Sequence, residues 1–372
     1  MKPLDLGVFR IDAPLGEGGM GVVFRGRHVE QDVPVAVKVI HPEEAGREAV
    51  QRAFADEVRA VAGLDHPGIV LLFDQGVVAP DLAAQSDGRL VAGSPWLVME
   101  LASGGSLAGH PLPKSWEAVS ALLLPLLDAL AHAHARGVIH RDLKPGNILL
   151  GTGDDLRPGL KLTDFGIAQA VARFGRRDDA GSRERAGGTP SYMAPEQFQG
   201  QWRDQGPWTD LYSLGCLTWQ LVTGQLPFTA DSILGLAVAH MHAPLPTFAP
   251  RFPVPSGLDD LLRGLLEKAP ARRFERAADV AAALSALSAV TGADEEDVDP
   301  ALSVTVDIAP TLSVATNARP SGPRPTSRGL GVAEGRADAS APPPLVPPAT
   351  WPPEHVPSHP FRLLGAGLGL PQ

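Results

Sequence analysis

The chain has 372 residues, a formal net charge of −10 at pH 7 and one cysteine. This length leaves room for one large domain and an additional segment. The negative charge argues against a nucleic-acid partner, and a single cysteine excludes an internal disulfide and fits a reducing compartment.

Closely spaced glycines stand near the N-terminus, in residues 15–23 (LGEGGMGVV). The G-x-G-x-x-G spacing of Gly16, Gly18 and Gly21 is weak evidence alone, because dinucleotide-binding folds share it. A dinucleotide fingerprint opens a helix, whereas Val23 and its neighbours continue as β-type sequence. The pattern therefore predicts the bend of a β-hairpin, whose backbone can close over phosphate oxygens because glycine lacks a Cβ.

The next predicted strand, residues 34–40, carries one lysine, Lys38, among apolar residues. Alone, it could equally be an edge residue whose ammonium reaches solvent. After a glycine-rich hairpin it is better explained as a phosphate ligand. Residues 48–64 have helical periodicity, and Glu57 lies next to the apolar stripe. On a helix packed against the strand, Glu57 would pair with Lys38, the alternative being an ordinary surface glutamate.

Residues 140–147 (HRDLKPGN) follow a long apolar helical stretch. Their spacing suits phosphoryl transfer: Asp142 would deprotonate an attacking hydroxyl, Lys144 would neutralise charge on the moving group, and Asn147 would hold a metal ion. An ordinary turn after a helix is the alternative, since these residue types are common in turns. Eight ordered residues favour the chemical interpretation.

A second acid, Asp164, ends a short predicted strand in residues 161–166 (KLTDFG). A β-hairpin between the two motifs would bring Asp142 and Asp164 to one cleft. Asp164, Asn147 and ATP oxygens would form a suitable Mg²⁺ site, with Mn²⁺ as the alternative ion. Residues 188–196 (GTPSYMAPE) complete the series of motifs.

With these motifs in this order, residues 8–288 resemble the eukaryotic-like (Hanks-type) protein kinases, in particular the bacterial serine/threonine group. The resemblance implies an α+β fold with two lobes: a β-rich N-terminal lobe with one main helix, about residues 8–100, and a mainly α-helical C-terminal lobe, about residues 101–288. It implies transfer of the ATP γ-phosphoryl group to serine or threonine hydroxyls of proteins. The implied catalytic residues are Lys38, Glu57, Asp142, Lys144, Asn147 and Asp164.

The same resemblance implies which residues would bind ATP. Met99 would guard the back of the nucleotide pocket, and residues 100–102 would form the hinge that hydrogen-bonds adenine. The expected set is Leu15, Gly16, Gly18, Gly21, Val23, Ala36, Lys38, Met99, Glu100, Ala102 and Leu149. Ser106 is a departure, because many relatives carry there an acid that binds the ribose, so that contact is in question.

Further positions match structural features of these kinases. Glu196 would form an ion pair with Arg273, and Asp210 would brace the catalytic loop from an apolar helix. In the family, a lysine at the position of Lys144 accompanies serine/threonine specificity, and Thr189 matches its companion threonine.

Arg141 implies regulation, because an arginine before the catalytic aspartate usually awaits an anion on the activation loop. Between residues 169 and 188 the only hydroxyl side chain is that of Ser182. We hypothesise that Ser182 is an autophosphorylation site, reached through self-association of two copies. The alternative is that acidic neighbours, such as Asp178 or Glu184, supply the anion constitutively.

Other features carry less information. The apolar run 121–130 is short and interrupted by a proline and an aspartate, and we recognise no N-terminal signal peptide, so we expect a cytoplasmic protein without a membrane span. His132 and His134 point to different helix faces, which disfavours a metal site. Cys216 is expected to pack in the core. The long connection 77–95 is expected to be a surface excursion or a docking site.

Residues 289–372 differ in composition from the rest. An acidic stretch at 293–297 precedes a segment rich in proline and alanine, which is typical of a disordered linker or tail. The apolar end, residues 361–370, would either bind a partner or belong to the start of a further module.

Three alternatives to a protein kinase acting by itself stay open. One is a pseudokinase-type, nucleotide-binding regulatory module, which the presence of Lys38, Asp142 and Asp164 disfavours. Another is the N-terminal fragment of a larger kinase–ATPase protein. A third is a small-molecule kinase, against which residues 188–196 argue.

Overall fold

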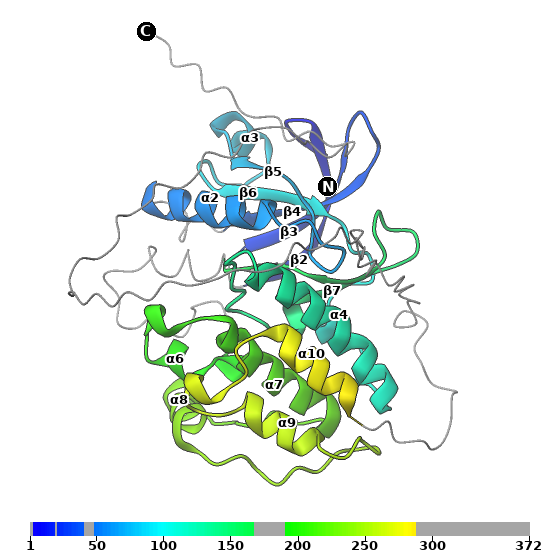
Figure 1. Ribbon diagram of the computed structural model, residues 1–372. Helices are drawn as coiled ribbons and strands as arrows, with labels where there is room; N and C mark the ends of the chain where they lie inside the picture. The colour runs from blue at the N-terminus through cyan, green and yellow to red at the C-terminus, as the bar shows by residue number, and fades with distance from the viewer. Residues whose placement is uncertain (1–2, 19–20, 41–47, 167–189, 288–372) are drawn as a thin grey trace, which may run out of the picture. The chain divides into compact units, whose positions relative to one another are not determined.

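The structure is a computed structural model and describes residues 3–18, 21–40, 48–166 and 190–287 (Figure 1). Every described residue belongs to the first unit of the chain, which lies within residues 1–305. The expectations for Ser182, for Thr189 and for the tail after residue 288 therefore lie outside the described residues.

An antiparallel sheet forms the N-terminal part of the first unit. Its strands follow the order β1-β2-β3-β4-β6-β5. They are β1 (Leu4–Leu6), β2 (Phe9–Gly18), β3 (Gly21–His28), β4 (Pro34–Ile40), β5 (Leu72–Val77) and β6 (Pro95–Glu100). Gly18 pairs with Gly21 across the β2–β3 hairpin, which confirms the hairpin that the glycine spacing predicts. The sheet begins at Leu4, upstream of residue 8.

Strand β4 is central in this sheet, between β3 and β6, and all its residues except the first are buried. Alternate residues face opposite sides. Val35, Val37 and Val39 lie in one hydrophobic cluster, and Ala36 and Ile40 lie in another. Lys38 has the same parity as Ala36, so its side chain leaves the sheet on the side of the second cluster. The alternative of an exposed edge lysine is therefore wrong.

Two helices cover the sheet. Phe54 and Val58 of α2 (Glu48–Ala62) belong to the cluster of Ala36 and Ile40. On the other face, α3 (Pro80–Gln85) brings in Leu82. The connection 77–95 lies at the surface, as expected, and many of its residues are exposed. It is also packed, because Val78, Leu82 and Leu90 are buried in the cluster that contains the valines of β4.

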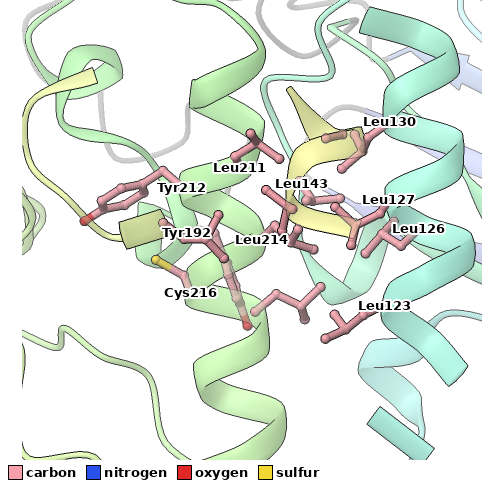
Figure 2. Close-up of a cluster of buried hydrophobic side chains, with 14 of the residues drawn as sticks. Leu123, Leu126, Leu127, Leu130, Leu143, Tyr192, Leu211, Tyr212, Leu214 and Cys216 are labelled. Atoms are coloured by element: carbon pink, nitrogen blue, oxygen red, sulfur yellow. The ribbon is translucent and has the colours of Figure 1, made fainter. Parts of the chain in front are cut away.

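The C-terminal part is helical. It contains α4 (Trp116–His134), the hairpin of β7 (Ile148–Gly151) and β8 (Gly159–Leu162), α6 (Pro195–Phe198), α7 (Pro207–Thr223), α8 (Ile233–His242), α9 (Leu258–Leu265) and α10 (Ala277–Ala286). Figure 2 shows leucines of α4 facing Leu211 and Leu214 of α7, with Leu143 of the loop between α4 and β7 beside them. Cys216 is fully buried in this core, as expected. With the β-rich sheet before these helices, the expected α+β fold is confirmed.

Among the described residues, one helix, α4, is long and apolar enough to cross a membrane by length and composition. Of its most apolar window, 56% is buried inside the protein, and Leu126, Leu127 and Leu130 belong to the larger core. Core helices that never meet a membrane pass the same test.

His240 on α8 is a fully buried histidine inside an aromatic cage. Its Nδ1 lies 2.9 Å from the hydroxyl oxygen of Tyr212. The ring centroids of Phe198 and Phe228 lie 5.4 and 5.0 Å from the centroid of the imidazole. Burial lowers the pKa of His240 from 6.5 to about 4. The folded protein therefore keeps this ring neutral at a pH where the unfolded chain protonates it.

We expect this histidine to make folding sensitive to acid. As the pH falls, His240 becomes protonated in the unfolded chain before it does in the folded protein. The free energy of unfolding therefore has its full value above about pH 6.5 and decreases as the pH falls to about 4. The total loss from this histidine is about 3 kcal/mol. In urea titrations at both ends of this range, His240→Phe should lose less unfolding free energy on acidification than the wild type. The exposed neighbour variant His242→Phe should behave like the wild type. Equal acid sensitivity of the two variants would contradict the prediction.

Candidate active site

The loop between α4 and β7, which carries residues 140–147, is held in place by a buried carboxylate. Asp210 on α7 has no solvent exposure, and it accepts hydrogen bonds from the backbone N–H groups of His140 at 2.8 Å and Arg141 at 2.7 Å. Its Oδ2 also lies 2.7 Å from Nε2 of His134. Burial alone would raise the pKa of Asp210, but the hydrogen bonds and the nearby imidazoles lower it. The carboxylate thus stays ionised and fixes the loop, with Arg141 at φ +63°.

A second set of contacts joins this loop to the end of β8. Nε2 of His140 lies 2.9 Å from the carbonyl oxygen of Thr163. The backbone N–H of Thr163 donates to the carbonyl oxygen of Asn147 at 3.0 Å. Ile148 pairs with Leu162 in the β7–β8 hairpin. The hairpin therefore brings the two acidic motifs to one site, as the sequence predicts.

Asp142, Lys144 and Asn147 form a connected group in that site. Nζ of Lys144 donates to Oδ2 of Asp142 at 2.8 Å, and Nδ2 of Asn147 donates to the same oxygen at 2.9 Å. Burial raises the pKa of Asp142, while the charge and hydrogen bond of Lys144 oppose the shift. A carboxylate whose pKa is raised by burial is a stronger base than an exposed one, which suits Asp142 to take a proton from a hydroxyl group.

The opposing effect of Lys144 leads to a pH prediction. If Asp142 is the general base, it acts only when ionised, and the acid limb of a kcat/KM profile then follows the pKa of its carboxyl group. Removing the positive charge in Lys144→Gln should raise that pKa further and move the acid limb to higher pH, whereas Lys144→Arg should leave it in place. Profiles recorded with a peptide acceptor would decide, and an unmoved or lowered limb in Lys144→Gln would contradict the prediction.

The expected pair between Lys38 and Glu57 is not formed, and this expectation is corrected. Nζ of Lys38 lies 2.7 Å from Oδ1 of Asp164. Oε1 of Glu57 instead lies 3.8 Å from Nη1 of Arg141, and burial raises the pKa of Glu57. A Cβ on Gly166 would lie 1.9 Å from the same Glu57 oxygen, so the carboxylate occupies space that only glycine leaves open. Lys38 and Glu57 are therefore both in the site, but Lys38 pairs with Asp164 and Glu57 lies near Arg141.

The expected adenine-binding residues converge on one hydrophobic cluster. Ala36 and Met99 are buried in it, and Val23 and Leu149 pack against it. Gly16 and Gly18 lie on β2, and Leu15 is half exposed there. Gly21 is required for close packing, because a Cβ on it would lie 2.0 Å from the carbonyl oxygen of Val39.

The residues expected to form the hinge follow β6. The carboxylate of Glu100 is buried, and it pairs with Arg157 from the β7–β8 loop. Within the part of the chain that the structure describes, the backbone N–H of Ala102 donates no hydrogen bond to the protein. The side chain of Glu100 is therefore engaged elsewhere, and only backbone groups of the hinge are available to a ligand. Sequence reasoning missed Arg157, because a lone arginine in a turn carries no signal.

A divalent ion would find suitable donors on the two acidic motifs. No group of three or more histidine, cysteine or acidic side chains that could hold a metal occurs among the described residues. The donors here are the carboxylate of Asp164 and the amide oxygen of Asn147, whose nitrogen is already engaged with Asp142. Mg²⁺ commonly uses one or two such protein oxygens and completes its shell with water and phosphate, so the residues fit.

The fold and the site together are those of a protein-kinase-type domain: an antiparallel sheet has a lysine in its central strand, a helical part follows, and an Asp–Lys–Asn loop lies beside a second aspartate. Residues 9–284 match the protein kinase domain family. The chain belongs to this family, and the resemblance seen in its motifs is confirmed.

Curated relatives agree with this membership. The chain is 38% identical over 272 residues to the serine/threonine-protein kinase Pkn1 of Myxococcus xanthus, a match that covers 72% of this chain and 36% of that protein. It is 37% identical over 289 residues to PknL of Mycobacterium tuberculosis, covering 75% of this chain and 65% of PknL. For PknJ of the same species the identity is 35%, with 75% and 45% covered. The chain thus matches between about a third and two thirds of these relatives' lengths.

Proposed function

We propose that this chain is a serine/threonine protein kinase that transfers the γ-phosphoryl group of ATP to hydroxyl groups of proteins. The observation that carries the proposal is the connected group of Asp142, Lys144 and Asn147. It lies beside an aspartate, Asp164, that is in contact with Lys38 of the central strand.

The mechanism is inferred from these contacts. The carboxylate of Asp142 accepts the proton of the acceptor hydroxyl while the hydroxyl oxygen bonds to the γ-phosphorus and the bond between that phosphorus and the bridging β-phosphate oxygen breaks. The ammonium of Lys144, now 2.8 Å from that carboxylate, neutralises negative charge on the moving phosphoryl group. Lys38 supplies the second cation, on the α- and β-phosphates.

Mg²⁺, or Mn²⁺ in its place, would be held by Asn147 and Asp164 and would neutralise charge on the β- and γ-phosphate oxygens. Before it binds, Lys38 holds the carboxylate of Asp164 in the site at 2.7 Å. Because Lys38 is buried, the pair keeps Asp164 oriented with little competition from water.

Serine and threonine are the proposed acceptors. Lys144 stands at the position that goes with this specificity in related kinases, and the curated relatives Pkn1, PknL and PknJ are named serine/threonine-protein kinases. Cytoplasmic signalling, autophosphorylation at Ser182 and self-association of two copies belong to the same proposal.

The test is transfer of radiolabelled γ-phosphate from ATP with Mg²⁺ to the protein itself and to a generic basic acceptor protein, followed by phosphoamino-acid analysis. We expect phosphoserine or phosphothreonine. Label on tyrosine would overturn the acceptor class. Binding of ATP without any transfer would overturn the activity and favour a nucleotide-binding regulatory module.

A further inference from the structure

The loop between β7 and β8, residues 152–158, reaches the hinge with a buried ion pair. Nε of Arg157 donates to Oε2 of Glu100 at 3.0 Å, and its Nη2 donates to Oε1, which makes the pair bidentate. The same Nη2 donates to the carbonyl of Ile69 at 2.7 Å. Glu100 is 1% exposed, and its Oε1 also accepts the N–H of Leu71 at 2.8 Å. Arg157 thus fixes the last residue of β6 at the start of the hinge.

A second side chain of the same loop fixes the other end. Oδ2 of Asp155 accepts hydrogen bonds from the backbone N–H of Ser103 at 2.8 Å and from its hydroxyl at 3.0 Å. The same oxygen accepts the N–H of Thr152 at 2.7 Å, which stiffens the loop. The carboxylate of Asp155 therefore holds the backbone of the hinge at Ser103, which lies three residues after Glu100.

Backbone contacts continue the attachment towards β7. The N–H of Gly104 donates to the carbonyl of Leu150, and the N–H of Leu150 donates to the carbonyl of Gly105, both at 2.9 Å. A Cβ on Gly104 would lie 2.6 Å from that Leu150 oxygen, so the two segments are in close contact. Only Leu101 and Ala102 lie between the two anchored ends, and the N–H of Ala102 donates no hydrogen bond within the described residues.

From this arrangement we infer that Asp155 and Arg157 are positioning residues for nucleotide recognition. They hold Ser103 and Glu100 so that the backbone of Leu101 and Ala102 keeps the geometry needed to hydrogen-bond an adenine base. Neither side chain touches the reacting atoms, so their effect is on the binding of the base. The inference rests on the proposed function in that it takes adenine as the base bound at the hinge.

This role accounts for the length of the loop. A two-residue turn would suffice to join two antiparallel strands, whereas here Gly151 pairs with Gly159 and seven residues lie between them. The additional residues bring one carboxylate and one guanidinium to the two ends of the hinge.

Two sets of variants test the inference. Asp155→Ala removes both hydrogen bonds that Ser103 donates to the carboxylate and leaves no buried charge. Ser103 then keeps the contact of its hydroxyl with that of Thr152 at 2.8 Å. Arg157→Gln alone would strand the buried carboxylate of Glu100 and could unfold the protein, so it is made together with Glu100→Gln. Asp154→Ala is the matched control, because Asp154 is the exposed neighbouring acid in the same loop.

In steady-state kinetics we expect KM for ATP to rise about fivefold in each test variant, because losing one ordinary hydrogen bond weakens binding by about this factor. We expect kcat to stay within about twofold of the wild-type value. Inhibition by adenosine, which offers only the base and ribose, should weaken by the same ratio. Inhibition by Mg²⁺-tripolyphosphate, which offers only phosphates, should not change. A general structural defect would instead lower kcat or weaken both inhibitors.

Unchanged KM and adenosine inhibition in Asp155→Ala, or equal effects in Asp154→Ala, would overturn the inference while leaving the kinase activity in place. Equilibrium titration with a fluorescent ATP analogue separates the two proposals. If the wild type binds the analogue but transfers no phosphate, the proposed function fails, and the ratio of dissociation constants still decides the role of the loop. If the wild type binds no adenine nucleotide, the inference is overturned as well.

Discussion

Asp142→Asn is expected to nearly abolish phosphoryl transfer while ATP binding persists. Asparagine has nearly the same shape and can still accept the hydrogen bond that Lys144 now donates at 2.8 Å, but it cannot take a proton from the acceptor hydroxyl. Loss of a general base lowers turnover by about 10²- to 10⁴-fold. The measurement is transfer of labelled phosphate to a protein acceptor, with ATP affinity determined separately by equilibrium titration.

The control for this variant is Asp81→Asn, which changes an exposed acid on α3 in the same way. It should keep wild-type turnover and ATP affinity. Retained turnover in Asp142→Asn would refute the assignment of Asp142 as the base. Loss of ATP binding in the same variant would mean that the substitution disturbs the site as a whole.

Arg273→Met is expected to cause the largest loss of stability. Arg273 is fully buried and forms a bidentate pair with Glu196, with distances of 2.8 and 2.9 Å between the guanidinium nitrogens and the carboxylate oxygens. Its remaining N–H groups donate to backbone carbonyls, including that of Glu267 at 2.7 Å. Removing the cation leaves the carboxylate buried and unpaired, which costs about 3–5 kcal/mol. Urea unfolding followed by circular dichroism would measure the loss.

Two further variants make this prediction specific. The double variant Glu196→Gln, Arg273→Met should recover part of the lost unfolding free energy, because no uncompensated charge remains. Arg272→Met, at the exposed neighbouring position, should change stability by less than about 0.5 kcal/mol. Similar losses for Arg272→Met and Arg273→Met would show that the Glu196 pair is not the cause.

The partners of Glu57 and Lys38 illustrate the limit of reading a sequence. Periodicity places Glu57 beside the buried stripe of α2, and the parity of β4 places Lys38 on the face towards that helix. Which carboxylate reaches the ammonium depends on how α2 lies relative to the catalytic loop. In the structure Asp164 takes Lys38 and Arg141 takes Glu57, although the distance between Arg141 and Glu57, 3.8 Å, is that of a loose pair.

The connection 77–95 and the β7–β8 loop show the same limit for long loops. In the sequence both look like turn-rich insertions, because their apolar and charged residues follow neither a helical nor a strand period. In the fold, Leu82 of the first covers the valine face of the sheet, and Arg157 of the second neutralises Glu100. These contacts join residues that are far apart in the chain, so no local sequence pattern predicts them.

The sequence by itself determined the family, the proposed catalytic group of Asp142, Lys144 and Asn147, and the hairpin that brings Asp164 to that group, because phosphoryl transfer requires given residue types at short, ordered spacings. The tertiary structure decided which charges pair, which insertions pack and how the hinge is held. Those outcomes depend on where the packing of the hydrophobic cores places the helices and loops. A buried charge needs an opposite charge as partner, and the packing decides which opposite charge is close enough.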